Sequence, residues 1–251
     1  MSPGPKLYGL LAKLNCLDRL GKLLRTPVRN NARLIVGDSH QLLADACRHL
    51  LQPEFDVVAI AGTGRELVQA TLKLKPEGVI LEVSLPQLNG LDAAEQIKRK
   101  LPATRLVFLS ANRQPEIAAE AFRRGASGYL LKQSGSAEYL TGIRSAMSGE
   151  SFLSPLIARE TMEYLLYRPR QAVSSKQITP RQREILQLLM EGRSMKQVAS
   201  VLGVETGTVA FHKYNMMQKL GITSNAELLK FAFTRSTLLS NKQLASVALR
   251  C

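Results

Sequence analysis

Apolar residues between positions 32 and 150 follow two alternating patterns. Short apolar runs are typical of strands buried on both faces of a parallel sheet, and longer stretches with one apolar side are typical of amphipathic helices. The predicted strands are Arg33–Val36, Val57–Ile60, Val79–Leu81, Leu106–Leu109 and Gly128–Leu131. The predicted helices are Leu42–Leu51, Arg65–Leu74, Leu91–Arg99, Pro115–Arg124 and Ala137–Ser148. Together they predict an α/β doubly wound, five-stranded parallel sheet.

After residue 177 the pattern is helical only. Thr179 is a favourable N-cap, Pro180 suits the first helical position, and Gln182 completes a capping box for the first helix. The three further helices predicted are Ser194–Leu202, Gly207–Leu220 and Asn225–Phe233. A tight turn with Gly203 at its corner joins the second helix to the third, which is the arrangement of a DNA-binding helix–turn–helix. We therefore predict a small all-α domain of four helices.

Charge is distributed unevenly along the 251 residues. The net charge is +14, yet residues 32–150 hold 14 Lys and Arg against 13 Asp and Glu, whereas residues 177–235 hold 8 against 4 and residues 1–31 hold 6 against 1. Basic regions beside a nearly neutral domain indicate a polyanionic partner, nucleic acid before membrane. The predicted organisation is an N-terminal extension (1–31), an α/β domain (32–150), a linker with a helix (151–176), a helical domain (177–235) and a tail (236–251).

Several classes of protein are disfavoured. No stretch reaches the roughly 18 consecutive apolar residues that span a bilayer, so we expect no integral membrane association. The N-terminus lacks the pattern of a secretory signal, and the three cysteines, Cys16, Cys47 and Cys251, are odd in number and far apart. We expect reduced thiols and a cytoplasmic protein.

Polar residues stand where the predicted strands end. In "VILEVSLPQLNG", Glu82 directly follows the third strand, and Asp38, Ser110 and Lys132 follow the first, fourth and fifth. In a parallel sheet these ends meet at one edge, where ligands bind. Four polar groups converging there are more than a strand pattern requires.

Residues 32–150 resemble the receiver domain of a bacterial response regulator. The resemblance implies that two acids after the first strand hold Mg²⁺, that an aspartate after the third strand accepts a phosphoryl group, and that Ser110, Lys132 and the aromatic Tyr129 complete the pocket. Two positions depart from the family. The acidic pair reads Gly37-Asp38, and the acceptor position is Glu82.

These departures bear on the chemistry. Glutamate is longer than aspartate by one C–C bond, about 1.5 Å, and misplacement on the order of 1 Å can cost about a hundredfold in rate. Without an acid at Gly37, we expect Asp38 and Glu82 to hold Mg²⁺ weakly if at all. Two interpretations of Glu82 remain open. Its carboxylate either substitutes partly for a phosphoryl group beside Lys132, or pairs with Lys132 in a domain kept as a dimerisation scaffold.

The third helix of the C-terminal block has two different faces. At 100° per residue, Val209 and Met216 share one face, whereas an aromatic and amide face points the other way. Aromatic groups can contact thymine methyls, Asn and Gln can bind adenine, and basic residues contact phosphates. The candidate DNA-binding residues are Arg193, Lys196, Thr208, Ala210, Phe211, Lys213, Tyr214, Asn215 and Gln218.

The strings "ITPRQREIL" (178–186) and "TVAFHKYNMMQKLG" (208–221) resemble those of the LuxR-type helix–turn–helix in NarL/FixJ response regulators. The resemblance implies homodimers on paired operator half-sites of double-stranded DNA, with the Asn225–Phe233 helix as a pairing surface. Ala210 and Phe211 stand where the family usually has polar or basic residues, so its base preferences do not transfer.

The whole pattern predicts a DNA-binding transcriptional regulator, not an enzyme, that acts without phosphorylation. The alternatives are a conventional phosphorelay regulator that uses a sensor histidine kinase or small phosphodonor, and a receiver-based interaction module. The basic amphipathic stretch within residues 1–31 is compatible with an anionic membrane surface, with a groove on the receiver, or with no selected role.

Overall fold

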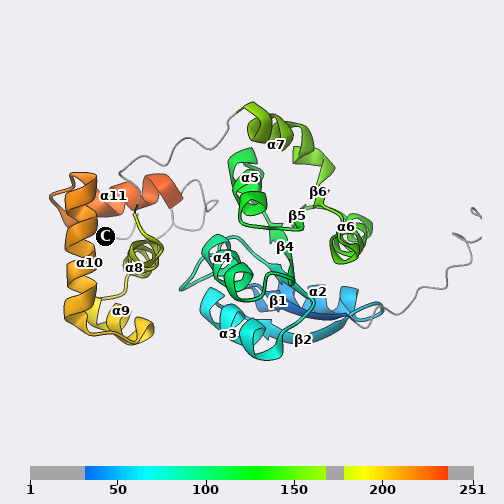
Figure 1. Cartoon of the computed structure of the whole chain (residues 1–251), viewed down its shortest axis with the longest axis horizontal. Coiled ribbons are helices and arrows are strands. Elements are labelled where there is room, and N and C mark those ends of the chain that lie inside the picture. Colours follow the sequence, from blue (N-terminus) through cyan, green and yellow to red (C-terminus); the bar gives the residue numbers. More distant parts are fainter. Residues whose placement is uncertain (1–31, 168–177, 237–251) are drawn as a thin grey trace, which may run out of the picture.

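A computed structural model describes residues 32–167 and 178–236. The predictions for the N-terminal extension, for most of the C-terminal tail and for residues 168–177 of the linker lie outside these described residues. In the described part, an α/β domain and an all-α domain lie side by side, with the helical domain beside α3 (Gly64–Leu74) and α4 (Gly90–Lys100) (Figure 1).

The sheet of the first domain is wholly parallel. Its strand order is β2-β1-β3-β4-β5-β6, which agrees with the predicted doubly wound fold. The strands are β1 Arg33–Gly37, β2 Asp56–Ala61, β3 Gly78–Leu81, β4 Arg105–Ser110, β5 Gly128–Leu131 and β6 Phe152–Leu153. The predicted number of five strands is one short, because the two-residue β6 extends the edge beyond β5.

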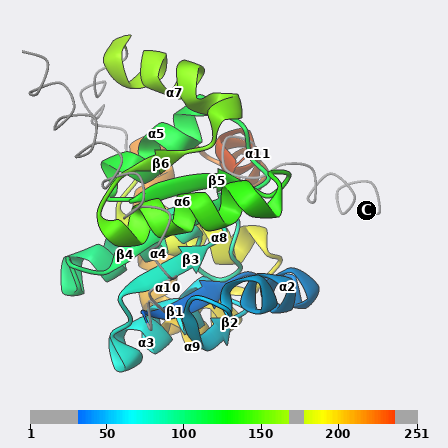
Figure 2. The ribbon, with the colours of Figure 1, turned by 90° about the vertical axis from the view of Figure 1, so that its right-hand side faces the viewer.

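Helices cover both faces of this sheet. On one face α2 (Gln41–Leu51) and α6 (Ser136–Ser148) cover a core that includes Leu34, Ile80 and Leu130. On the other face α3, α4 and α5 (Pro115–Arg123) cover a core that includes Ile35, Leu81 and Phe108. Figure 2 views the molecule from the side that carries α2 and α6, with the helical domain behind the sheet. Successive strand residues point to opposite faces, and both faces are buried, so continuous apolar runs were needed.

Part of the predicted linker belongs to the first domain. β6 pairs with β5, and α7 (Pro155–Tyr167) packs against α5. Ser154 lies between β6 and α7, and its hydroxyl accepts a hydrogen bond from the Leu131 N–H of β5 at 3.1 Å. The Arg123 guanidinium also lies 5.6 Å from the centre of the Tyr164 ring on α7.

The second domain has the four predicted helices: α8 Pro180–Met190, α9 Met195–Leu202, α10 Thr206–Leu220 and α11 Asn225–Ser236. Capping explains where the first two begin, because Thr179 with Gln182, and Ser194 with Gln197, form complete capping boxes. Gly203 ends α9 with a φ of 63°, a left-handed conformation that glycine adopts without steric cost. Two small apolar clusters around Ile185 and Met216 hold the helices together.

Candidate functional site

The buried carboxylate of Glu82 is at the centre of the pocket at the carboxyl edge of the sheet. One oxygen, Oε1, accepts three hydrogen bonds: from the Val83 N–H at 2.7 Å, from the Ser84 N–H at 3.3 Å and from the Ser110 hydroxyl at 3.0 Å. Only 6% of Glu82 is exposed. A buried carboxylate needs this number of donors, because an unpaired one would carry a large desolvation cost.

Lys132 lies between two carboxylates. Its Nζ is 2.6 Å from Oε2 of Glu82 and 2.6 Å from Oδ2 of Asp38. Burial by itself lowers the pKa of Lys132, but the attraction of Glu82 and the contacts with Asp38 outweigh it and raise the pKa above its ordinary value. The four predicted polar residues are therefore brought together: Ser110 and Lys132 bond to Glu82, and Lys132 also bonds to Asp38.

The arrangement does not fit a magnesium ion well. Mg²⁺ prefers octahedral oxygen coordination, whereas both carboxylates here face the Lys132 ammonium. Within the described residues, no group of three His, Cys, Asp or Glu side chains could hold a metal. The missing acid at Gly37 has a structural counterpart, since a Cβ at this position would lie 2.7 Å from Cδ2 of Leu67. Leu67 thus occupies the space that a side chain at position 37 would need.

Tyr129, the predicted aromatic member of the pocket, is fully buried. Its ring stacks on Phe108 with 6.2 Å between the ring centres, and its hydroxyl donates to the carbonyl of Asn112 at 2.9 Å. The Asn112 N–H in turn donates to the Ser110 hydroxyl at 3.1 Å. The aromatic side chain is therefore connected to Glu82 through Asn112 and Ser110.

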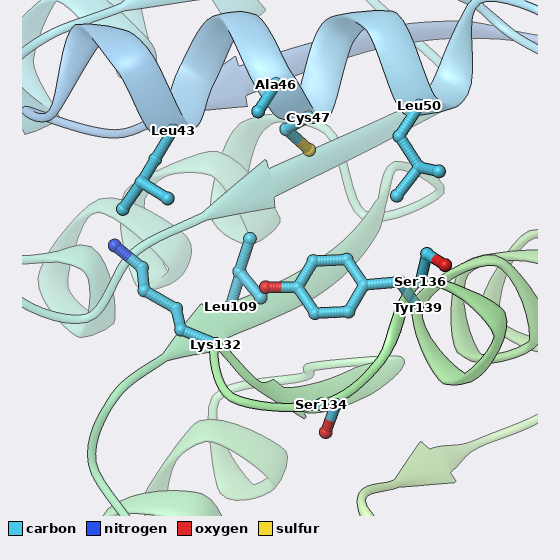
Figure 3. A pocket seen from close by; sticks show the side chains of 9 residues that line it. All are labelled: Leu43, Ala46, Cys47, Leu50, Leu109, Lys132, Ser134, Ser136 and Tyr139. Atoms are coloured by element: carbon cyan, nitrogen blue, oxygen red, sulfur yellow. The ribbon is translucent and has the colours of Figure 1, made fainter.

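A pocket of about 200 Å³, which the sequence did not predict, lies beside Lys132. In Figure 3, Leu43, Cys47 and Leu50 of α2 face Tyr139 of α6 across this pocket, with Lys132 at one end. Burial, and to a lesser extent Asp38, raise the pKa of the Cys47 thiol to about 12. The thiol is therefore protonated at neutral pH and poorly nucleophilic.

The loop that begins at Glu82 contacts the second domain directly. The Gln187 side chain on α8 donates to the Leu85 carbonyl at 2.9 Å and accepts from the Asn89 N–H at 2.9 Å. At the C-cap of α8, Glu191 accepts from the Gln87 N–H at 2.8 Å. The loop thus has the pocket at one end and the helical domain along its length.

Two buried carboxylates extend this domain interface. Asp92 on α4 accepts from Arg124 of its own domain at 2.6 Å and from Arg183 of α8 at 2.9 Å. Burial opposes ionisation of Asp92, but Arg183 and Arg124 together lower its pKa below the ordinary 3.8. Glu184 is a carboxylate of the helical domain, and it accepts from Arg65 at 2.9 Å and from Gln96 at 2.9 Å, both of which belong to the receiver-like domain. The interdomain partners of Asp92 and Glu184 are about 90 or more residues away in the sequence, so no local pattern predicts them.

Helix α10 presents the predicted aromatic face to solvent. Val209 and Met216 are fully buried, whereas Phe211 is 62% and Tyr214 60% exposed. The Gln218 amide donates to the Tyr214 hydroxyl at 2.8 Å. The other candidate DNA-binding residues differ in solvent exposure. Those exposed are Lys196, Thr208, Ala210 and Gln218, and those partly buried are Arg193, Lys213 and Asn215. Arg193 also lies 3.5 Å from Glu191.

Comparison with known proteins agrees with both domains. Residues 34–144 match the response regulator receiver domain, and residues 176–232 match the bacterial regulatory proteins of the luxR family. The transcriptional regulatory protein MctR of Rhizobium johnstonii is 33% identical over 208 residues, which cover 81% of this chain and 94% of that protein. The nitrate/nitrite response regulator protein NarL of Escherichia coli is 29% identical, covering 78% and 92%.

Two solved structures show the same folds. A LuxR-family two-component response regulator from Aurantimonas is 30% identical, with a TM-score of 0.52, over 54% of this chain and 99% of that one. RcsB of Salmonella enterica, solved on promoter DNA, is 24% identical, with a TM-score of 0.51, over 81% and 98%. This second likeness supports the fold alone.

A receiver domain followed by a LuxR-type helix–turn–helix defines a response regulator with a DNA-binding domain, a class that regulates transcription. The chain belongs to this LuxR family of response regulators, as its similarity to MctR over nearly the whole of that protein shows. Among the residues that the structure describes, no helix is long and apolar enough to cross a bilayer.

Proposed function

We propose that this regulator binds operator DNA without being phosphorylated at position 82. The observation that carries the proposal is that the Glu82 carboxylate accepts from Ser110, Lys132 and two backbone N–H groups. Hydroxyl, ammonium and amide donors of this kind stabilise a phosphoryl group. Here they are already occupied by a carboxylate of the chain itself.

The same contacts support partial mimicry of the phosphorylated state. An ionised Glu supplies one negative charge, against about −1.5 to −2 for a phosphate group. Asp38 and Glu82 share Lys132, so we propose that magnesium binds weakly if at all and that no catalytic turnover occurs at this pocket. The contrasting interpretation, in which the Glu82–Lys132 pair merely maintains a dimerisation scaffold, rests on the same ion pair and needs a separate test.

The DNA-binding part of the proposal rests on α10 and its surroundings. Exposed Lys196 and partly buried Lys213 suit phosphate contacts, and we propose that the exposed face of α10 enters the major groove. RcsB dimers have been solved on DNA. We propose homodimers on paired half-sites here as well, acting in the cytoplasm, with α11 as the pairing surface. Leu229 on α11 is 45% exposed and suits such a contact.

The first experiment is intact-protein mass spectrometry after incubation with acetyl phosphate and Mg²⁺, for the wild type and for Glu82→Asp. We expect the wild type to stay unmodified. A wild type that gains a phosphoryl group would support the conventional regulator, which a kinase or small phosphodonor activates. If only Glu82→Asp gains the group, Glu82 alone blocks the chemistry. If neither does, the loss of an acid at Gly37 has already removed the metal site.

A second experiment separates the mimic from the scaffold. Glu82→Gln keeps the shape of the side chain but removes its charge, so a mimic predicts weaker dimerisation in sedimentation equilibrium. Glu150→Gln, at an exposed position of the same domain, is the matched control. Unchanged dimerisation of Glu82→Gln would reject the mimic and leave the scaffold.

Binding to operator DNA is tested by its dependence on salt. A regulator that contacts phosphates should show log K falling with log[salt] at a slope of about −0.9 per phosphate contact. A receiver that only captures protein partners should show no specific binding to any duplex.

A further inference from the structure

Phe211 is an exposed aromatic residue on a helix that already has an apolar core face. The buried side of α10 is made by Val209 and Met216, which belong to the two apolar clusters of the helical domain. Phe211 and Tyr214 belong to neither cluster. Aromatic side chains are enriched at interfaces relative to the rest of a protein surface, and residues three apart share one helix face, so Phe211 and Tyr214 together present an aromatic contact surface.

The contacts of the domain do not account for this ring. The first domain is contacted by α8, through Arg183, Gln187 and Glu191, and this contact leaves Phe211 62% exposed. Its one described ring contact is an edge-on approach to the neighbouring His212, with 5.9 Å between ring centres. Phe211 is therefore available to a partner while the two domains remain in contact.

The chemistry of the major groove limits what such a ring can recognise. The edges of guanine, adenine and cytosine present hydrogen-bond donors and acceptors there, whereas thymine adds a methyl group. Phenylalanine has no hydrogen-bonding group, so the thymine methyl is the feature that it can distinguish by contact. Aromatic and apolar wedges between base pairs are typical of minor-groove proteins, whereas α10 is the second helix of a helix–turn–helix.

We infer that Phe211 determines operator specificity by contacting the methyl group of a thymine in each half-site. The inference rests on the proposed DNA binding and adds the base that is selected. Tyr214, one turn further on, acts differently, because its hydroxyl accepts from the Gln218 amide and holds that amide in place. Tyr214 is therefore a positioning residue for the Gln218 amide.

The test begins with the full-length protein and a random pool of duplexes, from which the bound sequences are selected. Each thymine of the selected operator is then replaced by deoxyuridine, which lacks only the 5-methyl group. We expect one deoxyuridine position per half-site to weaken wild-type binding by about fourfold, the value for one buried methyl-sized group. Phe211→Ala should bind more weakly and respond equally to thymine and deoxyuridine there. Leu156→Ala, which shortens an exposed apolar side chain of the receiver domain, should keep the wild-type response.

Because Phe211 is exposed, Phe211→Ala should fold, and circular dichroism checks this. If the selected operator binds but no deoxyuridine position weakens it, or if Phe211→Ala keeps the methyl response, the thymine inference is overturned and DNA binding stands. If Phe211→Ala instead loses the dimer in the absence of DNA, the ring is a pairing contact and the inference fails. If selection yields no preferred duplex and no salt-dependent binding, the proposed function itself fails.

Discussion

The receiver pocket and the exposed face of α10 use their functional groups in opposite ways. In the pocket, Glu82 and Asp38 both bond to Lys132, and the three side chains are at most 13% exposed. On α10, Phe211 and Tyr214 are about 60% exposed and lie outside the core clusters. The difference indicates that the first region has its partner built in, whereas the second is shaped for a partner outside the chain.

We expect the largest effect, a loss of folding stability, when the cation of the pocket is removed. Lys132→Met would leave two buried carboxylates facing each other, and losing one member of a buried ion pair costs about 3–5 kcal/mol. Urea denaturation at pH 7 measures the loss. The double variant Glu82→Gln/Lys132→Met should recover part of it, because one of the two stranded charges is gone. Equal losses in both variants would show that Glu82 and Lys132 are not coupled.

The other region is tested by its basic residues. Lys196→Ala and Lys213→Ala should each weaken binding to all duplexes alike and reduce the salt slope by about 0.9, the value for one phosphate contact. Fluorescence anisotropy at several salt concentrations measures both quantities. Lys98→Ala, in the receiver domain, is the control and should leave the slope unchanged. A slope that stays constant in the two helical-domain variants would contradict their assignment to phosphates.

The domain interface also depends on a buried ion pair, between Arg183 and Asp92, but its two members come from different domains. Arg183→Ala removes the interdomain partner of Asp92, and a hydrogen bond to a charged group is worth about 1.5–3 kcal/mol. We expect a larger radius of gyration by X-ray scattering. Arg159→Ala is the matched control, because Arg159 pairs with Glu163 of its own helix, away from the domain interface. The same scattering profile for all three proteins would mean that Asp92 does not hold the domains together.

Acid should have the same effect as that substitution. The pKa of Asp92 is lowered in the folded protein, so its contribution is complete above the ordinary value of 3.8 and is lost as the pH falls through the lowered pKa. In Arg183→Ala, this acid-dependent change should begin at a higher pH than in the wild type. X-ray scattering or intrinsic fluorescence follows this acid-dependent change. The measurement runs from pH 6 down to the acid limit of folding, over roughly three pH units.

The smallest expected effect concerns Cys47. Because burial raises its pKa to about 12, its thiol should react slowly with iodoacetamide at pH 8 in the native protein and fast after unfolding. A variant with Cys16→Ser and Cys251→Ser isolates the signal, which mass spectrometry reads. Fast reaction in the native state would show that the pocket beside Lys132 opens readily.

The strands around the pocket and the starts of the first two helices of the C-terminal domain follow from residues close together in the sequence, so they were predictable. The strands that end at Asp38, Glu82, Ser110 and Lys132 were recognisable because each is a continuous apolar run, and parallel strands place those ends together. The capping boxes at Thr179 and Ser194 are equally local. β6 was missed because two residues carry no periodicity, and its existence depends on pairing with β5.

Features that depend on distant partners were not predictable. Asp92 and Arg183 are 91 residues apart, and neither is unusual within its own helix. The assignment of hydrogen bonds to each Glu82 oxygen also needed the structure. Sequence comparison with the receiver family identified Gly37 as a missing acid, but only the structure shows that Leu67 fills its place.

That last feature bears on any redesign of the pocket. Replacing Glu82 with aspartate restores one residue type but leaves position 37 a glycine, where an added Cβ would lie 2.7 Å from Cδ2 of Leu67. An acid added at position 37 would require the Leu67 side chain to shift or to be shortened. The packing of one core side chain therefore sets the condition for placing a second acid beside Asp38.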